Sequence, residues 1–335
     1  MVTIRLMIAC SLLFLLSGGC MDQSELKTAP LKVGLVFDVG GRGDKSFNDS
    51  AFAGLERAKK GLKIYYEYIE PGEGSDRETA LRQFAGQKFD LIFGIGFMFT
   101  DDINHIALDF PEIKFACVDY AIIPGKKIPE NVIALKFREE EGSYLVGALA
   151  AIVSKTKKLG FVGGMDIPLI HKFEAGFKAG ARSAVPGCEI FIGYAGVTAE
   201  AFKNPAKGKE IAISQFNKGA DIIYHASGST GLGVFEAARE KNTLAIGVDS
   251  DQYYEAPGFI LTSMVKGVDE SVYQTIKDCL DKKFRGGVRE LGLKEKGVGY
   301  VYDANNKNLI PEKVIKKVED LKKEIIAGKI KVPKE

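Results

Sequence analysis

Polar side chains recur in this sequence directly after short apolar segments. Asp38, Asp119 and Asp249 each end such a segment, and Lys266 ends a fourth. Paired carboxylate acceptors suit a vicinal diol, and aromatic faces suit a flat base. Glycines and aromatic residues occur near these positions or end further apolar segments: Phe47, Gly94, Gly96, Phe97 and the run Ser227-Gly228-Ser229-Thr230-Gly231. The combination predicts a recessed polar site for a small ligand.

A glycine-rich loop follows Asp38, and it matches neither of the two common phosphate-binding loops. A P-loop requires glycine directly before its lysine, where this sequence has Asp44 before Lys45. A dinucleotide-binding loop requires a third glycine at the position of Ser46. The carboxylates of Asp38 and Asp44 would also repel a phosphate. We expect Ser46 to be the N-cap of the helix that follows.

Each of these residues also has a purely structural interpretation. An aspartate at the end of a strand is more often a helix cap than a ligand contact. Lys266 could be a solvated surface charge, and Phe47 and Phe97 could be ordinary core residues. The joint occurrence of these features is what favours a binding site.

The sequence offers little for catalysis. The histidines are His105, His171 and His225, none of which accompanies a nucleophile in a recognisable motif, and the GxSxG motif is absent. Paired carboxylates could in principle hydrolyse glycosides. The cysteines downstream of Cys20 are far apart, without CxxC or His-rich spacing. The sequence therefore predicts no enzymatic activity, no metal site and no cofactor.

Alternating strand and helix patterns must position these residues. Strand followed by helix, repeated along the chain, predicts a parallel, doubly wound sheet. Ligands of such sheets bind beyond the carboxyl ends of the strands, which is where the polar residues occur. The first array has predicted strands at 31–37, 63–69, 89–95, 114–120 and 131–137, with a helix at 47–60 after the first.

The pattern then restarts, which predicts a second lobe of similar size. If the C-terminal part of the chain contributes strands and helices to both lobes, the chain crosses between them several times. Several such crossings would form a natural hinge. We expect 31–137 with 250–288 to form the N-terminal lobe, and 138–249 with 289–330 to form the C-terminal lobe. The second array has predicted strands at 159–163, 189–194, 220–225 and 244–248, and the tail adds strands at 259–265 and 298–303 and helices at 271–283 and 311–326.

Length and charge agree with this organisation. The 335 residues exceed what one hydrophobic core usually organises. Lysine and arginine number 46 against 44 aspartates and glutamates, a net charge of +2. The charge balance predicts neither nucleic-acid binding nor a polybasic membrane patch.

The N-terminus has the features of an export signal. Arg5 precedes an apolar run at 6–16 that is too short to span a bilayer, and small residues precede Cys20. The segment resembles a bacterial lipobox, although Ser17 stands where leucine is usual. This predicts a signal peptide at 1–19, a lipidated Cys20 and a tether at 20–30, which would hold the protein at the membrane of the cell envelope. The alternative is an ordinary secretory signal with an incidental cysteine.

Five segments resemble the basic membrane protein family, which includes the purine-nucleoside receptor lipoproteins of ABC transporters. The resemblance runs in order from about residue 32 to residue 330. The segments are Asp44-Lys45-Ser46-Phe47-Asn48, residues 137–147, residues 163–168 with 173–177, residues 247–252 and residues 262–266.

The resemblance implies a type I periplasmic-binding-protein fold and an ABC transporter permease as partner. It also implies a purine nucleoside such as guanosine, inosine or adenosine as ligand, without ranking them. Two alternatives remain open at this point. One is a receptor for another small polar ligand, a sugar or signalling metabolite, on the same fold. The other is a surface lipoprotein without a transport role.

Site roles follow from the resemblance position by position. Phe47 and Phe202 match the aromatic residues that stack on the base from the two lobes. Asp249 and Lys266 match the pair that holds the ribose, with Lys266 keeping Asp249 ionised. Asp119 matches another polar contact, and Asp38 and Asn48 match positions that line the base end. Gly228 matches a backbone contact. Phe97 is also expected to contact the ligand, although some nucleoside-binding members have a small residue there.

Overall fold

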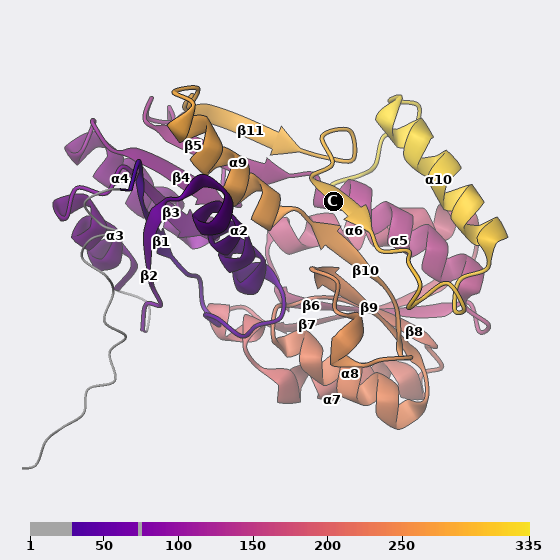
Figure 1. The fold of residues 1–335 in the computed structure, drawn as a ribbon. Helices are drawn as coiled ribbons and strands as arrows, with labels where there is room; N and C mark the ends of the chain where they lie inside the picture. The colour runs from indigo at the N-terminus through magenta and orange to yellow at the C-terminus, as the bar shows by residue number, and fades with distance from the viewer. Residues whose placement is uncertain (1–28, 73–75) are drawn as a thin grey trace, which may run out of the picture.

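Two α/β lobes form the molecule, as Figure 1 shows. The structure is a computed structural model, which describes residues 29–72 and 76–335. Each lobe contains a six-stranded sheet. The predicted signal peptide, Cys20 and the tether up to residue 28 lie outside the described residues.

The first lobe is built on a fully parallel sheet. Its strands run in the order β11-β5-β4-β3-β1-β2. The strand Leu91–Ile95 is buried along its whole length, as expected of a parallel sheet with both faces covered. The strands are β1 (Lys32–Val36), β2 (Tyr65–Ile69), β3 (Leu91–Ile95), β4 (Lys114–Val118), β5 (Val132–Phe137) and β11 (Gly287–Leu291), and the helices are α2 (Phe47–Leu62), α3 (Asp76–Gly86), α4 (Thr100–Asp109) and α9 (Val268–Leu280).

The second lobe repeats this arrangement with one difference. Its order is β12-β10-β9-β8-β6-β7, and β12 pairs antiparallel with β10, whereas a wholly parallel sheet was expected. The strands are β6 (Lys158–Met165), β7 (Glu189–Gly196), β8 (Ile222–Ala226), β9 (Leu244–Asp249), β10 (Ile260–Lys266) and β12 (Val298–Tyr300), and the helices are α5 (Glu139–Val153), α6 (Pro168–Ala184), α7 (Pro205–Asn217), α8 (Thr230–Lys241) and α10 (Glu312–Ile326). Short 3₁₀ turns are η1 (Phe97–Phe99), η2 (Ala199–Phe202) and η3 (Tyr253–Glu255).

Strand pairing corrects the expected division into lobes at two places. The segment 250–288 was assigned to the first lobe, but β10 within it pairs with β9 in the second sheet. The segment from 289 was assigned to the second lobe, but β11 pairs with β5 in the first sheet. A local pattern identifies a strand but not its neighbours, because pairing is a tertiary contact.

The chain passes between the lobes three times within the described residues, at 138, at 267 and at 292–297. Hydrogen bonds join these crossings to one another. The N–H of Arg138 donates to the carbonyl of Leu291 (3.0 Å), and the N–H of Gly267 donates to the carbonyl of Gly297 (2.8 Å). The three crossings therefore form one connected strip between the lobes.

Close helix packing fixes α6, whose first turn lies at the cleft. A Cβ atom at Gly176 would lie 2.2 Å from the carbonyl oxygen of Glu140, and one at Gly180 would lie 1.9 Å from that of Tyr144. Both distances are below any real Cβ contact, so only glycine lets α5 and α6 approach this closely.

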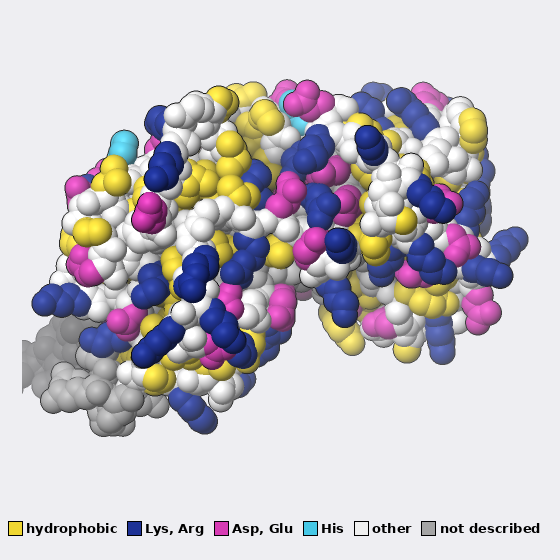
Figure 2. Space-filling model, turned by 90° about the horizontal axis from the view of Figure 1, so that it is seen from above, with side chains coloured by type: hydrophobic (Ala, Val, Ile, Leu, Met, Phe, Trp, Pro, Cys, Tyr) yellow, Lys and Arg dark blue, Asp and Glu magenta, His cyan; other side chains and the backbone are white. Residues whose placement is uncertain are grey.

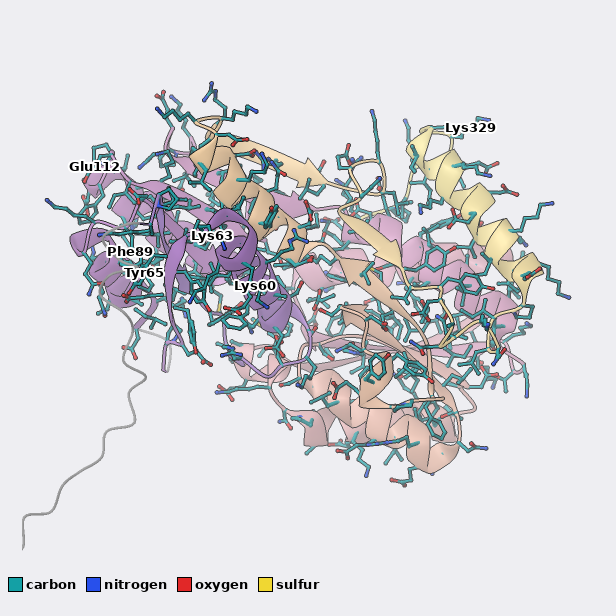
Figure 3. All side chains as sticks on the ribbon, in the orientation of Figure 1. Lys60, Lys63, Tyr65, Phe89, Glu112 and Lys329 are labelled. Atoms are coloured by element: carbon teal, nitrogen blue, oxygen red, sulfur yellow. The ribbon has the colours of Figure 1, made fainter. Side chains whose placement is uncertain are left out.

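Aromatic packing fills the first lobe away from the cleft. Tyr65 and Phe89, labelled in Figure 3, have ring centroids 6.3 Å apart, and the ring of Phe84 lies 4.8 Å from that of Phe89.

On the face seen in Figure 2, lysine and arginine are interspersed with aspartate and glutamate, in keeping with the near-neutral net charge. Between residues 29 and 335, apart from 73–75, no helix has both the length and the apolarity that crossing a membrane requires.

Candidate ligand-binding cleft

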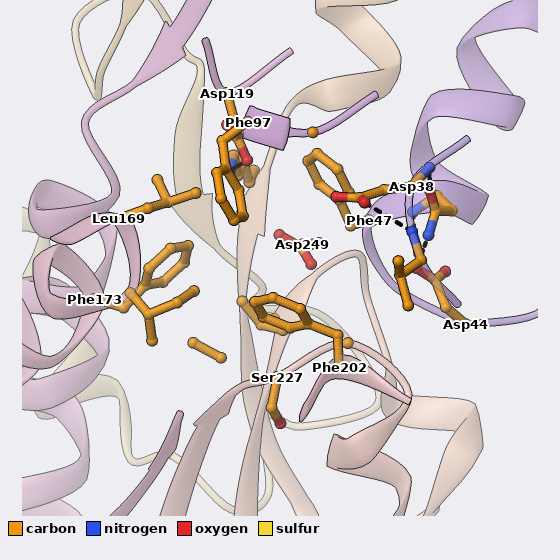
Figure 4. A pocket seen from close by; sticks show the side chains of 18 residues that line it. Asp38, Asp44, Phe47, Phe97, Asp119, Leu169, Phe173, Phe202, Ser227 and Asp249 are labelled. Carbon is orange, nitrogen blue, oxygen red and sulfur yellow. Dashed lines mark hydrogen bonds and ion pairs between the residues drawn. The ribbon is translucent and has the colours of Figure 1, made fainter. Parts of the chain in front are cut away.

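One cavity between the lobes is lined by all nine residues that the sequence singled out. It encloses about 610 Å³ of empty space, its mouth included, so an occupant would be a small molecule. Figure 4 shows the labelled side chains converging on it. The nine are Asp38, Phe47, Asn48, Phe97, Asp119, Phe202, Gly228, Asp249 and Lys266.

Two aspartates occupy matching places in the two lobes. Asp119 directly follows β4 and Asp249 ends β9, and these strands hold the third position in the two sheet orders given above. Both residues have left-handed backbone conformations, with φ of 61° and 65°. Such a conformation costs energy for a residue with a Cβ atom, and aspartate is among the residues that adopt it. Here it turns each carboxylate into the cleft.

Lys266 pairs differently from the expectation. Its Nζ donates to Oδ2 of Asp119 at 2.7 Å and lies 3.2 Å from Oε1 of Glu139. The carboxylate of Asp249 instead accepts a hydrogen bond from the hydroxyl of Ser46 in the other lobe. Thus Asp249 and Lys266 do not pair directly as predicted. Each instead contacts the first lobe, Lys266 through Asp119 and Asp249 through Ser46.

Charges and rings keep Lys266 ionised. Its side chain is 2% exposed, and burial alone would lower its pKa, but Asp119 and Glu139 outweigh burial and raise the pKa above its usual value. The ammonium nitrogen also lies 5.1 Å from the ring centroid of Phe47 and 5.6 Å from that of Phe173. Cation–π attraction of this kind adds to the ion pairs.

Burial also shifts the carboxyl groups. It raises the pKa of Asp249 to about 6, an effect that the charge of Lys266 opposes. Burial likewise raises the pKa of Asp38 to about 7, with Arg77 opposing and Asp119 adding to the rise. Near neutral pH, Asp38 is therefore protonated in a large fraction of molecules and can donate a hydrogen bond as well as accept one.

The side chain of Asp44, rather than that of the N-cap residue Ser46, makes the capping hydrogen bonds of α2. Its carboxylate accepts hydrogen bonds from the backbone N–H groups of Ser46 (2.9 Å), Asn48 (2.8 Å) and Asp49 (3.1 Å). The hydroxyl of Ser46 makes no capping bond, because it donates to Asp249. Ser46 therefore stands at the N-cap position, as expected, but its side chain contacts the second lobe while the carboxylate of Asp44 makes the capping hydrogen bonds.

The amide of Asn48 is held in one orientation. Its Nδ2 donates to Oδ2 of Asp44 at 3.1 Å, and its Oδ1 accepts from the backbone N–H of Asp38 at 3.1 Å. Asn48 thus links the end of the first strand to the start of α2 and fixes the polar end of the cavity.

Aromatic side chains reach the cavity from both lobes. Phe47 begins α2 and Phe97 begins η1 in the first lobe, while Phe202 ends η2 in the second. Their rings point into the cavity in Figure 4. The hydroxyl of Ser229 donates to the carbonyl of Phe202 at 3.1 Å, and Gly228, with φ of 56°, passes against the same backbone.

Sequence reasoning missed part of the lining. Leu169, Ile170 and Phe173 come from the first turn and a half of α6, directly after β6, so the rule that ligands lie beyond strand ends could have found them. Phe173 lies in a segment that resembles the family, but no ligand contact was expected of it. The remaining lining residues, to which the sequence analysis gave no ligand contact, are Val39, Asp44, Gly96, Ala226, Ser227 and Val248.

The side chains that line the cavity are suited to hydrogen bonding and aromatic stacking rather than to metal binding. No histidine or cysteine lines it. Across the described parts of the chain, no cluster of His, Cys, Asp and Glu has a geometry that could hold a metal ion.

Comparisons with known proteins agree on one family. The family model described as ABC transporter substrate-binding protein PnrA-like matches residues 31–335. Basic membrane protein A of Borreliella afzelii is 36% identical over 322 residues, covering 94% of this chain and 95% of the relative. An uncharacterized lipoprotein of Pyrococcus abyssi is 37% identical over 299 residues, covering 85% and 72%. The crystal structure of an ABC transporter solute-binding protein from Aeropyrum pernix K1 has a TM-score of 0.83 and 31% identity, covering 91% of this chain and 94% of that one.

Proposed function

This chain belongs to the family of PnrA-like ABC transporter substrate-binding proteins, and we propose that its ligand is a purine nucleoside enclosed between the two lobes. The lobes have the type I periplasmic-binding-protein fold. Proteins of this family bind a small molecule for a transporter permease and are not enzymes.

The observation that carries the proposal is the pair of aromatic rings contributed by different lobes. Phe47 and Phe202 line one cavity from different lobes. A flat purine can stack on both only when the lobes enclose it, and each stacked aromatic contributes about 1–3 kcal/mol. Ligand binding would then stabilise the enclosed arrangement that a permease recognises.

The floor of the cavity supports recognition of a ribose. Oδ1 of Asp119 is buried and has no hydrogen-bond partner within the described residues, while Oδ2 is bound to Lys266. Buried acceptors are almost always paired in folded proteins, so a ligand hydroxyl is the natural donor. Asp249 supplies further acceptor oxygens beside it.

The opposite end suits the edge of a base. Asp38 and Asn48 lie there, and a carboxyl group with a pKa of about 7 can present both a donor and an acceptor. Purine edges offer donors and acceptors in pairs. Which purine is preferred depends on the direction of these hydrogen bonds.

Thermal unfolding with a panel of ligands tests the proposal. We expect guanosine, inosine or adenosine to raise the melting temperature, and the matching free bases to do so far less. A ligand at one hundred times its Kd stabilises by about 2.7 kcal/mol, so a tight ligand is evident. A shift with sugars or amino acids and none with any nucleoside would reject the nucleoside and favour another small polar ligand.

We also propose that the mature chain is anchored in the cell envelope through a lipid on Cys20. Small residues precede this cysteine, and the Pyrococcus relative is named a lipoprotein. Metabolic labelling with palmitate should mark the wild-type protein and not Cys20→Ala. If both chains are exported unlabelled, the segment is an ordinary secretory signal.

A further inference from the structure

Gln252 makes a hydrogen bond between the lobes without lining the cavity. It follows β9 in the second lobe and is 2% exposed. Its Nε2 lies 2.9 Å from the carbonyl oxygen of Lys45 in the first lobe. Its Oε1 lies 2.8 Å from the backbone N–H of Val248. Because a backbone N–H can only donate, this contact fixes which end of the amide is oxygen and makes Nε2 the donor to Lys45.

His225 holds the same amide from behind. Its Nε2 lies 3.0 Å from Oε1 of Gln252, so this ring nitrogen must carry the proton. Its Nδ1 then accepts a hydrogen bond from the hydroxyl of Ser227, at 3.2 Å. Burial lowers the pKa of His225 to about 4, which keeps the ring neutral near pH 7.

The chain of bonds therefore starts at the cavity wall, because Ser227 lines the cavity whereas His225 and Gln252 do not. The chain ends on a carbonyl of the opposite lobe.

The receiving loop in the first lobe is itself held rigidly. Lys45 has a left-handed conformation, with φ of 56°, and its N–H donates to Oδ2 of Asp49 at 3.0 Å. The next residue, Ser46, donates to Asp249 of the second lobe. One short loop thus meets the second lobe through a backbone acceptor and a side-chain donor.

We propose that Gln252, oriented by His225, is a positioning residue that clasps the Lys45 loop and holds the lobes around the ligand. The clasp slows ligand release and does not contribute to the stability of either lobe. This proposal rests on the proposed function in one respect: it requires that a small ligand binds in the cavity, whatever its identity.

The variant Gln252→Glu tests the clasp. A carboxylate still accepts from Val248 and His225, but it cannot donate to the carbonyl of Lys45. Loss of one hydrogen bond of ordinary strength should increase the dissociation rate of the ligand about three- to tenfold. The association rate should not change, whereas the melting temperature of the ligand-free chain should fall, because the variant buries a carboxylate; the release rate is therefore the readout that tests the clasp.

Gln215→Glu is a matched control. Gln215 is 3% exposed, and its Nε2 donates to the carbonyls of Phe161 (2.9 Å) and Phe191 (3.1 Å) within its own lobe. This variant should lower the melting temperature of the ligand-free chain and leave the release rate unchanged. A second clasp variant, Ser46→Ala, should speed release in the same direction as Gln252→Glu.

Lobe separation gives a readout that does not depend on the ligand's identity. Ile122 and Val197 follow strands of different sheets and are 49% and 76% exposed, and Cys117, Cys188 and Cys279 are buried. Spin labels on Ile122→Cys and Val197→Cys would report the separation, with guanosine as the probe. We expect Gln252→Glu to increase the distance between the two labels in the ligand-free chain, in the guanosine-treated chain or in both.

Two results are distinguishable. If guanosine leaves the wild-type separation unchanged, guanosine is not the ligand, and the comparison of Gln252→Glu with the wild type in the ligand-free chain tests the clasp. If Gln252→Glu matches the wild type in lobe separation in both conditions, or if its ligand release is no faster than that of Gln215→Glu, the clasp is wrong.

Discussion

The ammonium of Lys266, at the end of the second lobe's β10, lies 2.7 Å from the carboxylate of Asp119 in the first lobe. Glu139, in the first turn after one crossing between the lobes, lies 3.2 Å from the same ammonium. Lys172 binds the other oxygen of Glu139. A buried charge network thus joins the cavity floor to a chain crossing, so ligand contacts and lobe arrangement share the same groups.

Lys266→Met should destabilise the ligand-free protein by about 3–5 kcal/mol, because removing one partner leaves buried carboxylates unpaired. Urea unfolding measures the change. Lys277→Met is the control, since Lys277 pairs with Asp281 on the surface at 2.6 Å and its loss should matter little. Equal changes in the free energy of unfolding for the two substitutions would show that the buried network stabilises the fold no more than a surface ion pair does.

Asp249→Asn should weaken binding of a ribonucleoside by about 1–3 kcal/mol, since an amide keeps one acceptor for Ser46 but loses the charge and the second acceptor. Calorimetry with the ribonucleoside and its free base separates this effect from base recognition. Asp251→Asn, at an exposed neighbouring position, should leave both affinities unchanged. Unchanged ribonucleoside affinity in Asp249→Asn would move ribose recognition elsewhere.

The polar site was largely predictable because one geometric rule covers it. The carboxyl ends of parallel strands meet at one edge, so Asp38, Asp119 and Asp249 had to lie on the cleft side of their sheets. Which charges pair was not predictable. Lys266 reaches Asp119 and not Asp249 because the relative placement of two lobes decides it, and no local pattern encodes that placement.

The fold was predictable to a similar degree. Strands with continuous apolar residues, such as β3, were evident, whereas β11 was missed because Arg289 and Glu290 interrupt its apolar pattern. It is an edge strand with exposed positions, so burial places little demand on its residues. The capping bonds of Asp44 were missed because this residue lies two positions before the N-cap, where Ser46 has suitable cap chemistry.

Stability of the ligand-free protein should depend on Asp38 in a specific pH window. Burial raises its folded pKa to about 7, against an ordinary value of 3.8. The folded state therefore binds the proton more tightly than the unfolded state, so this group's contribution is fully present below about pH 4 and is lost as the pH rises through 7. Each pH unit within the window changes the free energy of unfolding by about 1.4 kcal/mol.

Asp38→Asn isolates this effect, because the amide does not titrate. Urea unfolding of both proteins between pH 4.5 and 8 in about half-unit steps should show the variant gaining stability relative to the wild type as pH rises. The opposite effect of His225, whose pKa is lowered by burial, cancels in the comparison. A difference that stays constant with pH would mean that Asp38 is ionised throughout.

Phe47→Ala and Phe202→Ala should each weaken nucleoside binding by about 1–3 kcal/mol. The two rings come from different lobes, so they can act on one base only if it lies between them. Their effects should then be coupled: once one ring is lost, the second substitution should cost less than it does alone, because the base is no longer held against the remaining ring. Calorimetry on the single and double variants measures the coupling energy.

Phe52→Ala controls for changes in the helix that carries Phe47. Its ring packs against Tyr68 with centroids 5.6 Å apart and lies outside the cavity, so the substitution should affect stability and not nucleoside affinity. Strictly additive effects of Phe47→Ala and Phe202→Ala would mean that the rings do not contact the same base. In that case each ring acts as part of its own lobe, and the two-sided stacking on which the nucleoside assignment depends does not occur.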